Sequence, residues 1–193
     1  MVSIDQLNKE QVVFVDETGK PTGETGPKID SHNAHTKLHR AFSCYVFNSE
    51  GKLLITQRAA GKKIWPNVWT NSVCGHPGPG ESYEAAISRR LDYELGLPPV
   101  SKLVNVVSEY IYRTPPYNGI IEHEFCPIFA GVLDQDPVPN PDEVAGYKWV
   151  TWQSLLDEVA RDPHDPGVYS FWMKDQLKLL RVNETILQLA HQM

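Results

Sequence analysis

Short runs of mostly apolar residues, separated by turn-forming segments, occupy the first third of the chain and are typical of β-strands. The segments 11–15, 42–47 and 53–57 are short and rich in apolar residues, so we expect three strands. The last two flank Asn48-Ser49-Glu50-Gly51, a turn-forming sequence that predicts a hairpin. Residues 16–28, DETGKPTGETGPK, are mostly Gly, Pro and polar residues and are expected to form turns.

The apolar residues follow a helical period between residues 81 and 95. They recur at Ala85, Ala86, Leu91 and Leu95, and Gly96 follows as a C-terminal stop with prolines beyond it. We therefore expect a helix over 81–95.

The second half of the chain predicts two long strands and two helices. The strands are expected at 103–112 and 120–133, joined by a loop at 114–119, and Pro127 should mark a bulge or an edge in the second one. A further strand is expected at 147–150, with helices at 152–160 and from 171 to about 189. Because strands and helices interleave, we predict an α/β fold, with a mixed β-sheet sandwiched between helices in a single domain over 1–193.

Composition and charge narrow the possible functions. The net charge of −6 argues against nucleic acid and acidic membrane surfaces as partners. No apolar run approaches the roughly 20 residues that span a bilayer, and the N-terminus lacks a signal-peptide pattern, so we expect a cytoplasmic protein without membrane insertion. Three cysteines do not suit a disulfide framework, and each is expected to be a thiol.

The most informative motif covers residues 75–97, GHPGPGESYEAAISRRLDYELGL. Its spacing places Gly75, Glu81 and Arg89 as they occur in the Nudix box of diphosphate hydrolases, which it resembles. Those hydrolases carry glutamates where this chain has Arg90, Tyr93 and Glu94, so one acid remains. Because hydrolysis needs the acidic cluster to hold metal ions and activate water, the motif predicts a scaffold that binds a diphosphate without cleaving it. The alternative is an ordinary amphipathic helix.

Histidine and glutamate residues suggest a metal site. His32 and His39 flank one segment, and His76 lies in the Gly75 loop. Glu122 and Glu124 are two apart on an expected strand, so their carboxylates should share a face. Imidazole with carboxylate suits Zn or Mn. The alternative is an exposed edge strand with solvated acids.

Other candidates come from cysteine, basic and aromatic residues. Cys74 lies beside the Gly75 loop and should have an accessible, perturbed thiol, whereas Cys44 and Cys126 are expected to pack in the core. A diphosphate site needs several cations, and the candidates are Lys28, Arg58, Lys62 and Arg90, with a solvated basic surface as the alternative. Most of the large aromatic residues should be core, although a tryptophan face can stabilise a carbocation in a dry pocket.

Three strings, TNSVCGHP at 70–77, YELG at 93–96 and IEHEFCP at 121–127, resemble the type I isopentenyl-diphosphate isomerases of the Nudix fold. The resemblance covers roughly residues 11–180 and leaves 181–193 as a C-terminal helical extension. It implies interconversion of isopentenyl diphosphate and dimethylallyl diphosphate through a tertiary carbocation, in isoprenoid biosynthesis.

The same resemblance implies roles for particular residues. Cys74 and Glu124 would be the acid–base pair, with Tyr112 near Glu124 and the Trp172 ring beneath the reacting carbon. One Mn or Zn ion would be bound by His32, His39, His76, Glu122 and Glu124. Glu94 would help to hold a Mg ion carried by the diphosphate, which would contact Lys28, Arg58, Lys62 and Arg90.

Two alternative functions stay open from the sequence. A Nudix hydrolase would need more acids than Glu94 supplies and has no task for Cys74. A non-catalytic metal- or diphosphate-binding module would not need Cys74, Glu124 and Trp172 together. The expected partner is a small diphosphate substrate, and the protein is expected to be a monomer or a weak homodimer.

Overall fold

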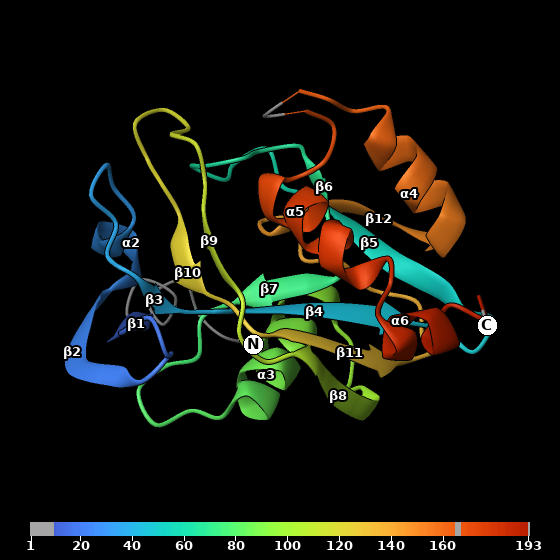
Figure 1. The fold of residues 1–193 in the computed structure, drawn as a ribbon, viewed down its shortest axis with the longest axis horizontal. Coiled ribbons are helices and arrows are strands. Elements are labelled where there is room, and N and C mark those ends of the chain that lie inside the picture. Colours follow the sequence, from blue (N-terminus) through green and yellow to red (C-terminus); the bar gives the residue numbers. More distant parts are fainter. Residues whose placement is uncertain (1–9, 165–166, 193) are drawn as a thin grey trace.

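The computed structural model describes residues 10–164 and 167–192, which form two mixed β-sheets and several helices (Figure 1). One sheet has the order β2-β1-β3-β10-β9, with strands Pro21–Pro27, Gln11–Val15, His39–Arg40, His123–Phe125 and Ile111–Arg113. The other has the order β12-β5-β4-β11-β8, with strands Val144–Thr151, Lys52–Arg58, Phe42–Phe47, Ile128–Val132 and Ser101–Val107. Two short strands join the second sheet: β6 (Trp69–Thr70) pairs with β5, and β7 (Val73–Gly75) pairs with β4.

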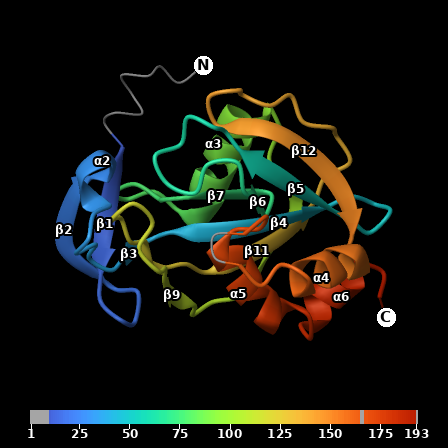
Figure 2. The same cartoon turned by 90° about the horizontal axis from the view of Figure 1, so that it is seen from above.

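Helices cover both faces of the larger sheet, which confirms the predicted sandwich. Along β4, Tyr45 and Phe47 belong to a core that includes residues of α4 (Trp152–Ala160), α5 (Phe171–Leu180) and α6 (Glu184–Leu189). Cys44 and Val46 belong to a second core with α3 (Tyr83–Leu95). Successive side chains of a strand point to opposite faces, so a continuous apolar strand serves both cores. Figure 2 shows α3 on one side of β4 and the other three helices on the opposite side.

Several local predictions are confirmed. The hairpin forms at Asn48–Gly51, where Asn48 N donates to Lys52 O at 2.9 Å. Helix α3 begins at Tyr83, two residues after the predicted start, because the Ser82 side chain caps it by accepting from Ala85 N, and it ends as predicted before Gly96, which has a φ of 60°. That left-handed conformation favours glycine, and it explains why the helix stops there. Helix α4 has the predicted bounds.

The two predicted long strands are wrong as continuous elements, because both pass from one sheet to the other. The chain crosses at Ser108–Tyr110 between β8 and β9 and at Cys126–Pro127 between β10 and β11. A third segment crosses at Ala41 between β3 and β4. The three segments are neighbours in the same order in both sheets. Backbone bonds join them at the crossing, with Cys126 N donating to Tyr110 O at 2.7 Å and Ala41 N to Phe125 O at 2.9 Å.

Two more predictions are corrected. Residues expected to be only turns include β2, an exposed edge strand paired with β1 alone, where proline and glycine do little harm. The expected long C-terminal helix is broken at 181–183, where Asn183 caps α6 by accepting from Ile186 N at 3.1 Å. Ile186 is fully buried in the same core as α5, so the predicted extension is part of this core.

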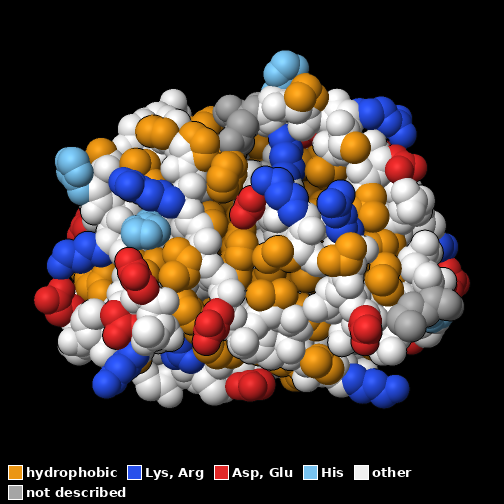
Figure 3. Space-filling model, viewed as in Figure 1, with side chains coloured by type: hydrophobic (Ala, Val, Ile, Leu, Met, Phe, Trp, Pro, Cys, Tyr) orange, Lys and Arg blue, Asp and Glu red, His pale blue; other side chains and the backbone are white. Residues whose placement is uncertain are grey.

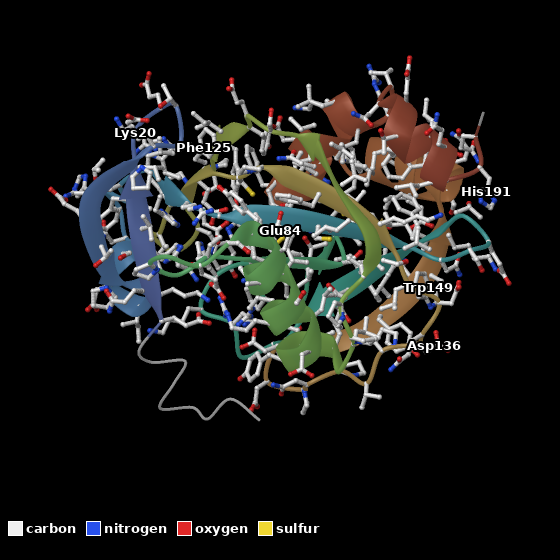
Figure 4. The ribbon with its side chains drawn as sticks, turned by 90° about the horizontal axis from the view of Figure 1, so that it is seen from below. Lys20, Glu84, Phe125, Asp136, Trp149 and His191 are labelled. Atoms are coloured by element: carbon white, nitrogen blue, oxygen red, sulfur yellow. The ribbon has the colours of Figure 1, made fainter. Side chains whose placement is uncertain are left out.

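The segment between β11 and β12 is attached to the larger sheet. Trp149 Nε1 on β12 donates to Asp136 Oδ1 at 2.7 Å, and the two side chains lie together in Figure 4. Farther along, Glu143 lies at the start of β12, where it reaches the site described below. A short helix, α2 (Lys28–Ser31), follows β2. In the part of the chain described, no helix is both long and apolar enough to cross a membrane.

Candidate active site

A cavity of about 630 Å³ opens where the two sheets meet. Its lining contains all but one of the residues predicted for the site: Lys28, His32, Arg58, Lys62, Cys74, His76, Arg90, Glu94, Tyr112, Glu122, Glu124 and Trp172. The exception is His39, which is fully buried on β3 beside Glu124. On the face seen in Figure 3, Lys and Arg side chains gather at the upper centre beside acidic and hydrophobic ones, although the net charge is negative.

The strand register brings a group of potential metal ligands together. Glu124 on β10 is paired with His39 on β3 and with Tyr112 on β9. His32 follows α2 and His76 follows β7, so four separate segments contribute. The ring centroids of the three histidines lie 4.9 to 5.2 Å apart. One ligand atom from each of His32, His39, His76 and Glu124 lies within 4.8 Å of the others.

Hydrogen bonds orient these imidazoles as they do in metal sites. His32 Nδ1 lies 2.9 Å from Lys28 O, and His39 Nδ1 lies 2.9 Å from Lys37 O. A carbonyl can only accept, so each Nδ1 carries the proton and each Nε2 keeps a free lone pair. Among the described residues, His39 Nε2 and His76 Nδ1 are buried without a hydrogen-bond partner. An unpaired buried nitrogen is costly, and a bound cation would satisfy the lone pair of His39. The residues therefore fit a divalent metal.

The electrostatics of the group also suit a cation. Burial lowers the pKa of His76 to about 3, so its imidazole is neutral. Burial opposes the charge on Glu124, but His39 and His76 outweigh it and hold the pKa of this carboxyl well below its usual range. Glu124 is thus a carboxylate among imidazoles, which is a donor set for Zn or Mn.

Glu122 lies outside the group of four, and its role as a ligand stays a prediction. It is 8% exposed and Glu124 is 6% exposed, so the alternative of solvated acids on an open edge is wrong. Both carboxylates share a face, as predicted, because Tyr112 OH lies 2.7 Å from Glu124 Oε2 and 3.1 Å from Glu122 Oε2. Burial and the nearby charge of Glu124 raise the pKa of Glu122 to about 7.

Cys74 lies on β7 at the wall of the cavity and is partly exposed, as predicted. Burial raises the pKa of its thiol to about 12, so it is protonated at neutral pH. The Sγ atom donates to Asn71 Oδ1 at 3.1 Å and lies 3.5 Å from Ser43 Oγ. Cys44 and Cys126 are buried, as expected for core residues, and all three cysteines are free thiols.

Three of the four predicted cations are paired with acids, and two of these acids, Glu10 and Glu143, were missed by sequence reasoning. Lys28 Nζ lies 2.6 Å from Glu10 Oε2, and Lys62 contacts Glu143. The buried guanidinium of Arg90 reaches Glu94 at 2.7 Å, Glu143 at 2.9 Å and Glu10 at 3.5 Å. Glu10 and Glu143 are remote from the motif in sequence, and no local pattern marks them. Glu94, the acid that remains at the three positions where hydrolases carry glutamates, is therefore paired with Arg90, which occupies another of these positions.

The apolar side of the cavity is aromatic. Trp172 on α5 is 2% exposed, and its ring packs edge-on to Trp65 at 6.2 Å. The Arg58 guanidinium lies over the Trp172 ring, 5.4 Å from its centroid, and donates to the carbonyls of Ile64 and Trp65 at 3.0 Å. Arg58 thus connects the loop at 61–65 to this wall of the cavity through hydrogen bonds. Its predicted role is to donate hydrogen bonds to the phosphate.

Comparisons with known proteins define the class. The family model of the NUDIX domain matches residues 37–171. A crystal structure of a Deinococcus radiodurans protein superposes with a TM-score of 0.64 at 23% identity, covering 91% of this chain and 99% of that one. This structural likeness shows the fold, which is that of the Nudix class.

Curated relatives are more similar in sequence. A protein of Kocuria rhizophila named isopentenyl-diphosphate Delta-isomerase is 45% identical over 177 residues, covering 92% of this chain and 96% of the relative. A protein of the same name from Saccharopolyspora erythraea is 46% identical over 168 residues, covering 87% and 84%. The chain belongs to the Nudix family and, within it, to the isopentenyl-diphosphate Delta-isomerases.

Proposed function

We propose that this chain is an isomerase that interconverts isopentenyl diphosphate and dimethylallyl diphosphate, a step of isoprenoid biosynthesis. One observation supports this proposal most directly. A single cavity contains a protonated thiol, a carboxylate and a cluster of cationic side chains. Its relatives bear the name of this activity. The missing Nudix acids fit the same conclusion, because isomerisation requires the diphosphate to be held and left intact.

The reaction adds one proton at C4 and removes another from C2, so the double bond moves from C3=C4 to C2=C3. Cys74 and Glu124 are the groups that exchange these protons, and Tyr112 holds the Glu124 carboxylate through its 2.7 Å hydrogen bond. A tertiary carbocation forms between the two proton transfers. Water would react with this carbocation if it were present in the cavity. Trp172, which lines the cavity and packs edge-on to Trp65, excludes solvent at that stage.

Two cation sites complete the proposal. His32, His39, His76 and Glu124, with Glu122 beside them, would hold one Zn or Mn ion. When bound, this ion would orient Glu124 and set its acidity. Glu94 would help to hold a Mg ion that arrives with the diphosphate, and Lys28, Arg58, Lys62 and Arg90 would neutralise the phosphate oxygens. Arg90 and Lys62 would exchange a carboxylate partner for phosphate as substrate binds.

The remaining predictions follow from composition. We expect a cytoplasmic enzyme, working as a monomer or a weak homodimer, that does not bind nucleic acid, given its net charge of −6.

Incubation with isopentenyl diphosphate and Mg should produce acid-labile dimethylallyl diphosphate without release of phosphate or pyrophosphate. Hydrolysis should stay at background because Arg90 and Tyr93 stand where hydrolases carry acids, and Glu94 is paired with Arg90 at 2.7 Å. Product formation is measured by the acid lability of the product, and phosphate release is measured with a colorimetric assay. Nucleoside diphosphates are the control substrates. Phosphate release at the rate of isomerisation would favour a hydrolase instead.

Replacing Trp172 should distinguish the contribution of its π-electrons to catalysis from the contribution of its volume. A desolvated cation over tryptophan is stabilised by about 2 kcal/mol, which corresponds to roughly 30-fold in rate. We expect Trp172→Phe to keep more kcat than Trp172→Leu, with KM changed little, because the charge exists only near the transition state. Circular dichroism checks that both variants fold. Equal kcat values would leave Trp172 a packing residue.

A further inference from the structure

Asn71, a buried amide, links two residues of the proposed machinery. Its side chain is fully buried in the loop between β6 and β7. Its Oδ1 accepts from Cys74 Sγ at 3.1 Å and from Trp172 Nε1 at 3.2 Å. Cys74 lies on β7 and Trp172 on α5, so one oxygen joins a strand of the sheet to a helix that packs on it.

The orientation of this amide is fixed by its other partners. Asn71 Nδ2 donates to Val73 O at 2.9 Å and to Cys44 O at 3.2 Å. A flipped amide would put its oxygen against these two carbonyls and its NH₂ group against the indole N–H of Trp172, which can only donate. Oδ1 therefore faces the thiol and the indole, and the backbone of β4 and β7 holds it there.

Helix α5 is also linked to the thiol through a second residue, Ser43. Ser43 Oγ lies 3.5 Å from Cys74 Sγ and accepts from Gln176 Nε2 at 2.9 Å. Tyr45 OH donates to Gln176 Oε1 at 2.8 Å, which fixes that amide too. Gln176 is one turn after Trp172, so a single helix face bonds to both hydrogen-bond partners of Cys74, Asn71 and Ser43.

We propose that Asn71 is a positioning residue that sets the Cys74 thiol and the Trp172 ring relative to one another, a role that rests on the proposed function. The S–H group rotates freely unless an acceptor holds it, and the indole N–H is buried and must be paired. Without Asn71, the thiol would lose its shorter hydrogen bond and keep only the 3.5 Å contact with Ser43 Oγ, and Trp172 would keep an unpaired N–H. Both changes act on the reacting geometry, whereas the cations that hold the diphosphate are untouched.

The Asn71→Ala variant should therefore lose roughly 100-fold in kcat, the loss that a misplacement of about 1 Å can cause, with KM near the wild-type value. The matched control is Ser72→Ala. Ser72 is also fully buried, donates to Leu54 O at 2.6 Å and accepts from Val46 N at 2.7 Å. It makes no hydrogen bond to Cys74 or Trp172 among the contacts of the described residues, so its variant should lose stability while keeping kcat. If Asn71→Ala does not fold, Asn71→Ser is expected to give the same pattern.

A double-mutant cycle tests the link itself. Trp172→Phe removes the indole N–H, so Asn71→Ala should reduce kcat by a smaller factor in that background than in wild type. Multiplicative effects, an equal kcat loss in Ser72→Ala, or a rise in KM with unchanged kcat would each overturn the role of Asn71. A wild-type enzyme without turnover would instead reject the proposed function, so the two failures are distinguishable.

Discussion

Cys74→Ser and Glu124→Gln are each expected to lower kcat by roughly 10²–10⁴-fold, the usual contribution of a general acid or base. Each change removes one group that is proposed to transfer a proton and leaves Lys28, Lys62 and Arg90 in place. Affinity for the diphosphate, measured by calorimetry, should therefore stay near the wild-type value. Turnover is measured with Mg and the second metal saturating.

Cys126→Ser is the matched control for the thiol. Cys126 is a free, buried cysteine whose Sγ lies 3.5 Å from Ser43 Oγ, the same distance as that of Cys74. It differs from Cys74 in that the latter lines the cavity wall. We expect Cys126→Ser to keep turnover. A Cys74→Ser enzyme with wild-type kcat would contradict the proposal that Cys74 and Glu124 exchange the two protons.

Metal content should fall from about one transition-metal ion per chain in wild type to far less in His39→Ala and His76→Ala. Each variant removes one of four converging ligands, and a site with three ligands binds more weakly. Elemental analysis after dialysis gives the content, and turnover should fall in parallel. Lowering the pH should also release the ion, because ligand histidines must be neutral to bind. Burial lowers the pKa of His39, but Glu124 outweighs burial and raises it, so His39 takes up a proton at a higher pH than an ordinary imidazole in the metal-free protein.

The control for this experiment is His123→Ala. His123 is adjacent to Glu124 on β10 but is outside the group of converging ligands found among the described residues. Its variant should retain the ion. Unchanged metal content in both His39→Ala and His76→Ala would show that the ion binds elsewhere.

Local sequence patterns determined the elements whose ends are set by neighbouring residues. Helix α3 was predictable because the apolar period lies between a Ser82 cap and Gly96, and both act within one turn. The hairpin at Asn48–Gly51 and helix α4 are equally local. The shared face of Glu122 and Glu124 followed from the two-residue period of a strand.

The resemblance to a known family, rather than periodicity, supplied the roles of the site residues. The strings around Cys74 and Glu124 carried it, and the cavity lining contains all but one of the residues that the resemblance implied, His39 being the exception. Glu10 and Glu143 were not among the residues that the resemblance implied. They pair with Lys28 and Lys62, which are proposed to bind phosphate, yet an isolated glutamate in a sequence does not reveal its partner.

Only the tertiary structure decided where the chain leaves one sheet for the other and what meets there. The residues on both sides of Tyr110 and Cys126 have a similar propensity for β-strands. The point at which the chain passes from one sheet to the other therefore depends on pairing between distant segments. That pairing places His39 beside Glu124 and Tyr112. The packing of α5 on the sheet brings Trp172 to Asn71, 101 residues away in the sequence. Such contacts depend on the packing of the whole core, so no local window of sequence contains them.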